Sequence, residues 1–213
     1  KIEYTTYEND LGEFGKGKKF YVRTYGCQMN EHDSEKIRGM LLSAGFTSCD
    51  DIIDADLIIL NTCAIRENAH DKVFGFLGVL KHMKKAKKDL LVGICGCMAQ
   101  EEVVVNEIIS KYKQVDFVCG THNLDNLLSI IKEKMDTNKR QIEVLSYEGD
   151  VVENIPVLRE SKYSAWVDII YGCDKFCTYC IVPYTRGTQR SRHHEDIINE
   201  VKDLVNNGYK EVT

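Results

Sequence analysis

Three cysteines lie within eight residues near the end of the chain. The segment Cys173-Asp-Lys-Phe-Cys177-Thr-Tyr-Cys180 has the spacing C-x3-C-x2-C. Thiolates at this spacing can surround one soft metal centre, and sulfur ligands favour zinc, copper(I) or an iron–sulfur cluster. A structural zinc site usually has four protein ligands, and His193 or His194 could supply the fourth. Three cysteines on a [4Fe–4S] cube instead leave one iron open to a substrate or cofactor, so the segment predicts one of these two kinds of site.

Three more cysteines, Cys27, Cys63 and Cys97, each follow a run of apolar or β-branched residues. If those runs are strands of one parallel sheet, their carboxyl ends meet at one edge and bring the thiols together. The small neighbours Gly26 and Gly96 would let the backbone approach a bulky ligand. The alternative is three buried small hydrophobic side chains, because free cysteine is often buried. Their equivalent placement at three strand ends favours a second metal-cluster site.

The elements that must position these cysteines alternate between strands and helices. β-branched and apolar runs predict strands, and apolar residues at helical spacing predict helices. The predicted strands cover 20–25, 57–60, 90–94 and 115–118, and the predicted helices cover 33–45, 69–84, 100–111 and 124–135. This alternation predicts βαβ units and a four-stranded parallel α/β domain.

From about Asp136 to Ser164 the composition differs from that of the α/β domain, and a second module follows. The second cysteine group follows a predicted strand at 165–171, and a helix at 196–207 and a strand from 211 come after it. One βα unit and the start of a strand cannot close a domain, so we expect a truncated second domain from a longer protein. The predicted organisation is an N-terminal extension over 1–18, the α/β domain over 19–136, a linker with short strands around 142–145 over 137–164, and the start of the second domain over 165–213.

Composition limits the classes of function. The 213 residues carry a net charge of −5, which excludes a uniformly basic nucleic-acid-binding surface but allows a local basic patch. No stretch approaches the roughly 18 apolar residues of a membrane span, and no basic-then-apolar leader opens the chain. We therefore expect a cytoplasmic protein without a membrane partner. Clustered cysteines in that compartment more often hold metal or do catalysis than form disulfides.

The array from Cys173 to Cys180, with Tyr179 before its last cysteine and a strand before its first, resembles the radical S-adenosylmethionine (SAM) enzymes. The resemblance implies that Cys173, Cys177 and Cys180 hold a [4Fe–4S] cluster at the start of a partial (β/α)6 barrel. The open iron would bind the amino and carboxylate groups of SAM, with Tyr179 near the adenine. A reductant protein such as flavodoxin or ferredoxin would supply the electron that cleaves SAM into methionine and a 5′-deoxyadenosyl radical. The glycine-rich SAM-binding segment of the family would lie beyond Thr213.

Most of the chain, from about Lys19 to Thr213, resembles the radical-SAM methylthiotransferases. The resemblance rests on four segments: Thr24–Asn30, Asn61–Glu67, Gly96–Gln100 and Cys173–Arg192. It implies a second [4Fe–4S] cluster on Cys27, Cys63 and Cys97, and no catalytic residue beyond the cluster ligands.

The branches of this family act on tRNA adenosine with an isopentenyl group, tRNA adenosine with a threonylcarbamoyl group, and a ribosomal-protein aspartate. The motifs Tyr-Gly-Cys-Gln-Met-Asn and Cys-Asp-Lys-Phe-Cys-Thr-Tyr-Cys look most like the first branch. The resemblance then implies a transferase that inserts a methylthio group at C2 of N6-isopentenyl-adenosine 37, with the tRNA anticodon stem-loop as partner. The alternatives are the same chemistry on the other two substrates, or a non-catalytic metal-cluster module that binds RNA.

Basic residues follow the second cysteine group. Arg186, Arg190 and Arg192 could contact RNA phosphates, with Phe176 and Tyr184 available for stacking. The alternative is that Arg186 and Arg190 pair with acids or connect the two domains. A lysine-rich run over 81–88 suits the end of a helix and is expected to be solvated. The three remaining cysteines are expected to be structural: Cys49, Cys95 and Cys119.

Overall fold

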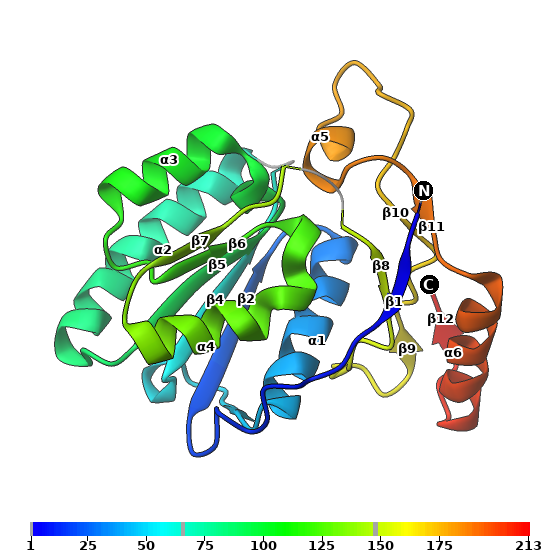
Figure 1. The fold of residues 1–213 in the computed structure, drawn as a ribbon, viewed down its shortest axis with the longest axis horizontal. Helices are drawn as coiled ribbons and strands as arrows, with labels where there is room; N and C mark the ends of the chain where they lie inside the picture. The colour runs from blue at the N-terminus through cyan, green and yellow to red at the C-terminus, as the bar shows by residue number, and fades with distance from the viewer. Residues whose placement is uncertain (1, 65–66, 147–148) are drawn as a thin grey trace.

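A computed structural model describes residues 2–64, 67–146 and 149–213. A parallel sheet forms the centre of its larger part, with helices on both faces (Figure 1). From edge to edge, its strands are β3 (Thr47–Ser48), β2 (Lys19–Tyr25), β4 (Leu57–Thr62), β5 (Leu91–Gly96), β6 (Phe117–Cys119) and β7 (Gln141–Glu143). The expected parallel α/β domain is confirmed.

Two long helices cover each face of this sheet. One face packs on α1 (Gln28–Ser43) and α4 (Leu127–Thr137), through a buried cluster that includes Phe20 and Phe117. The other face packs on α2 (Glu67–Ala86) and α3 (Glu102–Lys111) through a second cluster. All six residues of β4 are buried, which explains its continuous apolar run, because a central strand needs apolar contacts on both faces.

The sheet differs from the prediction in its edges. The sequence predicted four strands, and the sheet has six because two short strands, β3 and β7, join its edges. β3 has only two residues, which is too short for a periodic signal. β7 lies inside the stretch predicted as a linker, and it pairs in parallel with β6.

Helix α1 also differs, because it begins at Gln28 and not near Asp33. Its first turns are polar but buried; Asn30 and Ser34 have no exposed surface. Apolar periodicity therefore did not mark the start of this helix. As a result Cys27 is the residue that caps its N-terminus.

The rest of the chain forms small sheets beside α1. β1 (Tyr4–Thr6) pairs in parallel with β8 (Val151–Glu153), so the predicted N-terminal extension contributes a strand. The predicted single strand at 165–171 is wrong. The segment instead forms two short strands, β9 (Ser164–Ala165) and β10 (Ile170–Tyr171). The strand is interrupted because the carboxylate of Asp168, which lies between them, forms an ion pair with Lys36 on α1.

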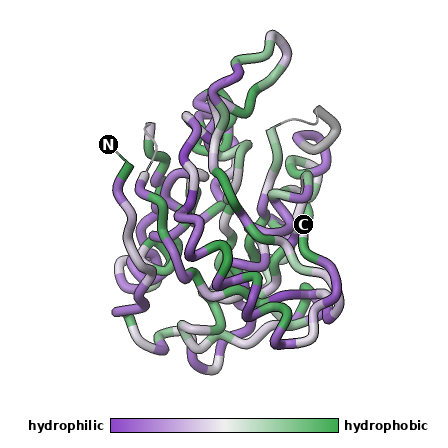
Figure 2. The backbone as a smooth tube through the Cα atoms, turned by 90° about the vertical axis from the view of Figure 1, so that its right-hand side faces the viewer, coloured by the Kyte–Doolittle hydropathy of each residue, from purple (hydrophilic) through white to green (hydrophobic). Residues whose placement is uncertain are grey.

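The two short strands have different partners. β9 pairs in parallel with β12 (Glu211–Val212) after α6 (His194–Asn206), whereas β10 pairs antiparallel with β11 (Arg190–Ser191). The loop that leaves β10 projects from the molecule and contains hydrophobic stretches (Figures 1 and 2). It ends in the short helix α5 (Val182–Arg186). No helix within the described ranges is long and apolar enough to cross a membrane.

Candidate metal-cluster site

The first three cysteines lie at the carboxyl ends of neighbouring strands. Cys27 follows β2, Cys63 follows β4, and Cys97 opens the 3-10 helix η2 (Cys97–Gln100) after β5. Strand register aligns these ends, because Thr62 of β4 is paired with the last residue of β2 and with the last residue of β5. The parallel topology therefore brings distant parts of the sequence to one edge of the sheet.

The thiols of Cys27 and Cys63 interact directly. A hydrogen bond with Cys63 is the main cause that lowers the pKa of the Cys27 thiol to about 5. Burial opposes this shift, while backbone N–H groups of Asn30 and Met29 at the start of α1 and the charge of Arg186 support it. The thiolate is the form of cysteine that binds metal, so this lowered pKa favours Cys27 as a ligand.

Cys97 is held by burial and by a contact with Arg186. Its side chain is buried, and the Nε of Arg186 donates a hydrogen bond to its Sγ at 3.2 Å. Burial raises the pKa of the Cys97 thiol, and the nearby guanidinium opposes that shift. Gly96 makes the turn before it, with φ at +92° and only 2.4 Å between an added Cβ and the Thr62 carbonyl oxygen. No other residue type fits this turn without strain.

The amide side chain of Asn30 ties two of these strand ends together. It donates hydrogen bonds to the Thr62 carbonyl at 3.0 Å and to the Asn61 side chain at 3.3 Å. Asn61 donates in return to the Asn30 carbonyl at 2.8 Å. This closed set of buried hydrogen bonds fixes the loops that carry Cys27 and Cys63.

The donor groups that these three cysteines bring to the sheet edge are all thiols. Among the described residues, no three Cys, His, Asp or Glu side chains converge closely enough to hold one metal ion. In an iron–sulfur cube each cysteine binds a different iron, so the sulfurs stand apart around the cluster. An all-thiol donor set fits such a cluster, as it fits other soft metal centres.

The second cysteine group lies on the projecting loop. Cys177 is exposed, Cys173 and Cys180 are half-buried, and the backbone N–H of Cys180 donates to the Cys177 carbonyl at 2.9 Å. Gly172 starts the loop with φ at +69°, where an added Cβ would come within 2.1 Å of the Thr188 carbonyl oxygen. The loop therefore leaves the molecule from a fixed base, and Cys177 is its most exposed cysteine.

Three exposed aromatic side chains lie on this loop and on the helix that follows it. Tyr179 is 94% exposed, and Phe176 and Tyr184, also exposed, meet edge to face with ring centres 6.0 Å apart. The two histidines considered as zinc ligands have other neighbours. His193 lies against the ring of Tyr4, and His194 is exposed beside Glu195.

Helix α5 packs the base of the loop against the strand ends that carry Cys27, Cys63 and Cys97, which we call the first cysteine site. It contacts both η2 and the 3-10 helix η3 (Thr121–Asn126), and the Thr121 hydroxyl hydrogen bonds to the Thr185 carbonyl. The Nη2 of Arg186 donates to Asp33 Oδ2 on α1 at 2.6 Å. The two cysteine groups are thus joined through this one short helix.

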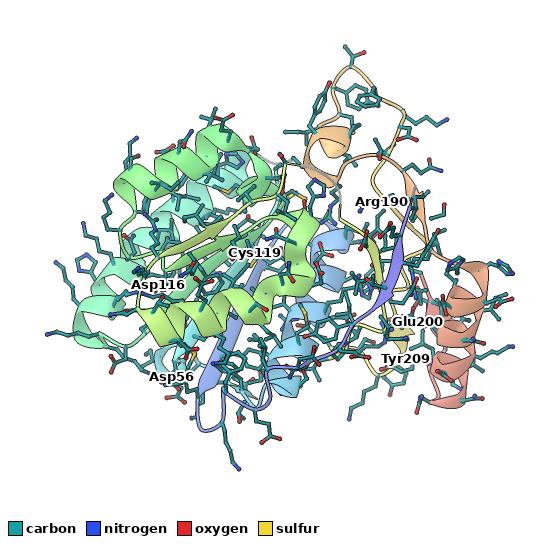
Figure 3. All side chains as sticks on the ribbon, viewed as in Figure 1. Asp56, Asp116, Cys119, Arg190, Glu200 and Tyr209 are labelled. Atoms are coloured by element: carbon teal, nitrogen blue, oxygen red, sulfur yellow. The ribbon has the colours of Figure 1, made fainter. Side chains whose placement is uncertain are left out.

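The three predicted RNA-binding arginines are engaged within the protein. Arg186 pairs with Asp33, and Arg192 pairs with Glu153 at 2.6 Å and Glu200 at 2.7 Å. Arg190, labelled in Figure 3, donates to the Gly149 carbonyl. The contact of Arg186 with Asp33 matches the alternative in which Arg186 and Arg190 pair with acids or connect the two domains, and RNA binding stays a prediction.

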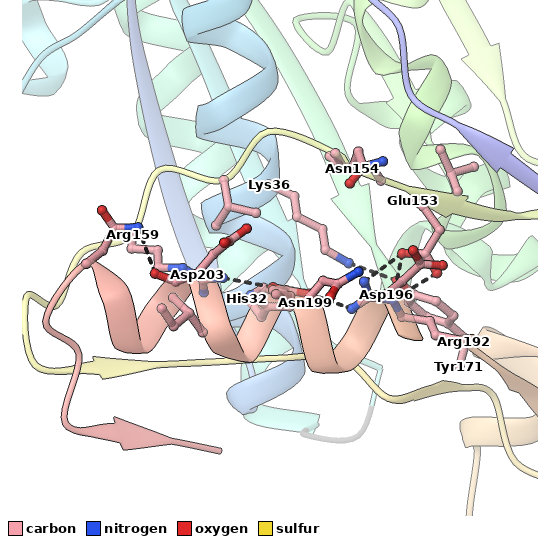
Figure 4. A pocket seen from close by; sticks show the side chains of 16 residues that line it. His32, Lys36, Glu153, Asn154, Arg159, Tyr171, Arg192, Asp196, Asn199 and Asp203 are labelled. Atoms are coloured by element: carbon pink, nitrogen blue, oxygen red, sulfur yellow. Dashed lines mark hydrogen bonds and ion pairs between the residues drawn. The ribbon is translucent and has the colours of Figure 1, made fainter. Parts of the chain in front are cut away.

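Sequence reasoning missed a polar cavity of about 550 Å³ between α1, α6 and the segment that follows β8 (Figure 4). Lys36 forms an ion pair with Asp168 beside it, and the Nζ of Lys36 also donates to the Tyr171 hydroxyl at 3.3 Å. His32 Nε2 lies 3.4 Å from the same carboxylate. His32 and Lys36 are one helical turn apart, so polar residues on one face of α1 were the available signal.

The other cysteines pack within the fold. Cys95 and Cys119 are opposite each other on β5 and β6, and both are fully buried. A hydrogen bond with Cys95 and burial raise the pKa of the Cys119 thiol, which makes it unreactive. Cys49 donates to the Phe20 carbonyl at 3.3 Å. The lysine-rich run is only partly solvated, because Lys84 pairs with the buried Asp116.

Comparison with known proteins identifies a matching family model and several similar curated proteins. Residues 19–120 match the uncharacterized protein family UPF0004. The chain is 58% identical over 204 residues to "tRNA-2-methylthio-N(6)-dimethylallyladenosine synthase" of Halalkalibacterium halodurans, covering 96% of this chain and 38% of the relative.

Two Bacillus proteins with the same name are similarly close. The B. cytotoxicus protein is 57% identical over 217 residues, covering 99% of this chain and 43% of the relative. The B. anthracis protein is 56% identical over 212 residues, covering 97% and 42%. The chain therefore spans about two-fifths of the length of the curated relatives it matches.

Proposed function

We propose that the chain belongs to the methylthiotransferase family of these relatives and is part of a tRNA-2-methylthio-N(6)-dimethylallyladenosine synthase. The reaction would place a methylthio group on C2 of an adenosine that carries an N6-dimethylallyl group. The described residues would then form the N-terminal cluster-binding domain and the beginning of the radical-SAM domain.

We propose Cys27, Cys63 and Cys97 as ligands of one [4Fe–4S] cluster, and Cys173, Cys177 and Cys180 as ligands of another. When bound, the second cluster with SAM would supply the radical chemistry and the first would supply sulfur. The single observation that carries the proposal is the docking of α5. It joins the base of the second cysteine loop to the strand ends that carry the first three cysteines.

The aromatic residues of the loop suit a nucleic-acid substrate. Carbon 2 lies at the minor-groove edge of a stacked adenine, so we expect the nucleotide to leave the stack to bring this carbon to the site. Exposed aromatic rings are the usual partners of unstacked bases in RNA loops. Tyr179 would face the SAM adenine, while Phe176 and Tyr184 offer further rings beside it.

Mass analysis of tRNA nucleosides tests the substrate. Deletion of the gene should abolish 2-methylthio-N6-dimethylallyladenosine and leave N6-dimethylallyladenosine in its place, and a plasmid copy should restore the modification. Loss of the methylthio derivative of threonylcarbamoyl-adenosine would assign the chain to the other tRNA branch. An unchanged nucleoside profile would contradict a tRNA substrate and favour the protein aspartate or the non-catalytic module.

A further inference from the structure

Arg186 ends α5 in the second domain, but its guanidinium lies among residues of the first. Its Nε donates to Cys97 Sγ at 3.2 Å, and its Nη2 donates to Asp33 Oδ2 at 2.6 Å. Only 12% of its side chain is exposed. Arg186 is therefore a buried cation that contacts a cysteine from the other domain.

Both contacts use the shape of the guanidinium. Its donors point in fixed directions from one plane, so a single arginine can bond two partners at a set angle. Asp33 lies on α1, the helix that begins immediately after Cys27, whereas Cys97 lies on η2. Arg186 thus connects the elements that carry two of the three cysteines.

The position of Arg186 does not depend on these two contacts alone. Its neighbour Thr185 is buried and accepts a hydrogen bond from Thr121 of η3 through its carbonyl. After Arg186, the Gly187 carbonyl accepts a hydrogen bond from the Cys173 backbone N–H at 3.0 Å. The arginine is therefore held at the point where the second cysteine loop meets the first cysteine site.

We propose that Arg186 is a positioning residue for the cluster on Cys27, Cys63 and Cys97, fixing Cys97 and raising the reduction potential of that cluster; this rests on the proposed function. An N–H donor to a ligand sulfur leaves the sulfur–iron bond intact, and it stabilises the more negative, reduced state. A permanent positive charge at the same place acts in the same direction. Reduction adds one electron from the external reductant, and no bond to Arg186 forms or breaks.

The test uses the full-length enzyme with Cys173, Cys177 and Cys180 changed to alanine, so that it contains only the first cluster. A dithionite titration followed by electron paramagnetic resonance measures the reduction potential of this parent and of its arginine variants. Arg186→Gln should shift the potential to a more negative value, and Arg186→Lys, which keeps the charge, should recover most of the shift. Arg192→Gln is the matched control, because this buried arginine pairs with Glu153 and Glu200 and touches no proposed ligand. It should leave the potential unchanged.

An unchanged potential in Arg186→Gln, or an equal shift in Arg192→Gln, would overturn the proposal. Iron content covers the case in which Arg186→Gln does not keep its cluster. Loss of iron in that variant alone, with retention in Arg186→Lys and Arg192→Gln, supports the positioning role. Equal loss in all three variants reflects general unfolding and counts against it. A parent that takes up no iron would instead contradict the proposed function.

Discussion

At the scale of single residues, a buried ion pair links α1 to the segment between β9 and β10. Lys36 on α1 and Asp168 between β9 and β10 are both nearly inaccessible, with side-chain exposures of 9% and 6%. Burial opposes ionisation of Asp168, but Lys36 and then His32 overcome that effect and hold its pKa below the usual value. Removal of one partner from a buried ion pair is strongly destabilising, because it leaves an uncompensated buried charge.

Asp168→Asn should therefore lower the free energy of unfolding at pH 7 by about 3–5 kcal/mol, because it leaves Lys36 buried without its counter-charge. The folded-state pKa of Asp168 is depressed, so its contribution is complete above the ordinary aspartate pKa of about 4 and is lost as the pH falls below it. Urea unfolding followed by the fluorescence of the single tryptophan, Trp166, measures the difference from pH 7 to pH 3.

Asp136→Asn is the control for this prediction. Asp136 forms an exposed ion pair with Lys132 on α4, so its loss should cost less than about 1 kcal/mol. A constant difference between wild type and Asp168→Asn across the pH range would contradict the role of the charged Asp168.

At the scale of elements, the positions of the proposed ligand cysteines depend on short turns more than on the long helices. The helices and central strands form a rigid frame, and the cysteines follow it on turns of a few residues. Gly96 is the clearest case, because it has a positive φ and close backbone neighbours directly before Cys97. The geometry of the proposed ligand depends on this turn.

Gly96→Ala should strain the turn and destabilise the protein by about 1–3 kcal/mol. We also expect lower iron uptake at the first site, because the strain displaces Cys97. Thermal unfolding and iron analysis after anaerobic reconstitution measure the two effects.

Gly75→Ala serves as the control for the turn. Gly75 lies within α2 with no atom near an added Cβ, so alanine there should stabilise the helix by about 0.5–1 kcal/mol and leave iron uptake unchanged. Wild-type stability and iron content in Gly96→Ala would show that the turn is not constrained as described.

At the scale of the whole molecule, the residues proposed for the reaction lie at one edge of the sheet. Parallel strands place the first three cysteines at their carboxyl ends, and α5 docks on that edge from the second domain. The polar cavity and the ion pair of Lys36 with Asp168 lie farther along α1, where the C-terminal segment packs on the same helix (Figure 4). The α5 contacts at the proposed reaction site and the ion pairs along α1 together hold the C-terminal segment on the sheet.

Sequence patterns predicted the parts of this arrangement that depend on local periodicity and on topology. The buried run of β4 predicted a central strand, and parallel order predicted that Cys27, Cys63 and Cys97 share an edge. The start of α1 was missed because its buried face is polar. The contact between Arg186 and Cys97 could not be predicted, because it joins residues 89 positions apart and depends on how α5 docks.

Iron analysis of the full-length protein tests the two-site account most directly. After anaerobic reconstitution the wild type should hold about eight irons per chain, as two [4Fe–4S] clusters require. Changing Cys27, Cys63 and Cys97 together to alanine should leave about four irons and preserve reductive cleavage of SAM. Loss of all iron in that variant, or one zinc per wild-type chain without SAM cleavage, would contradict the account.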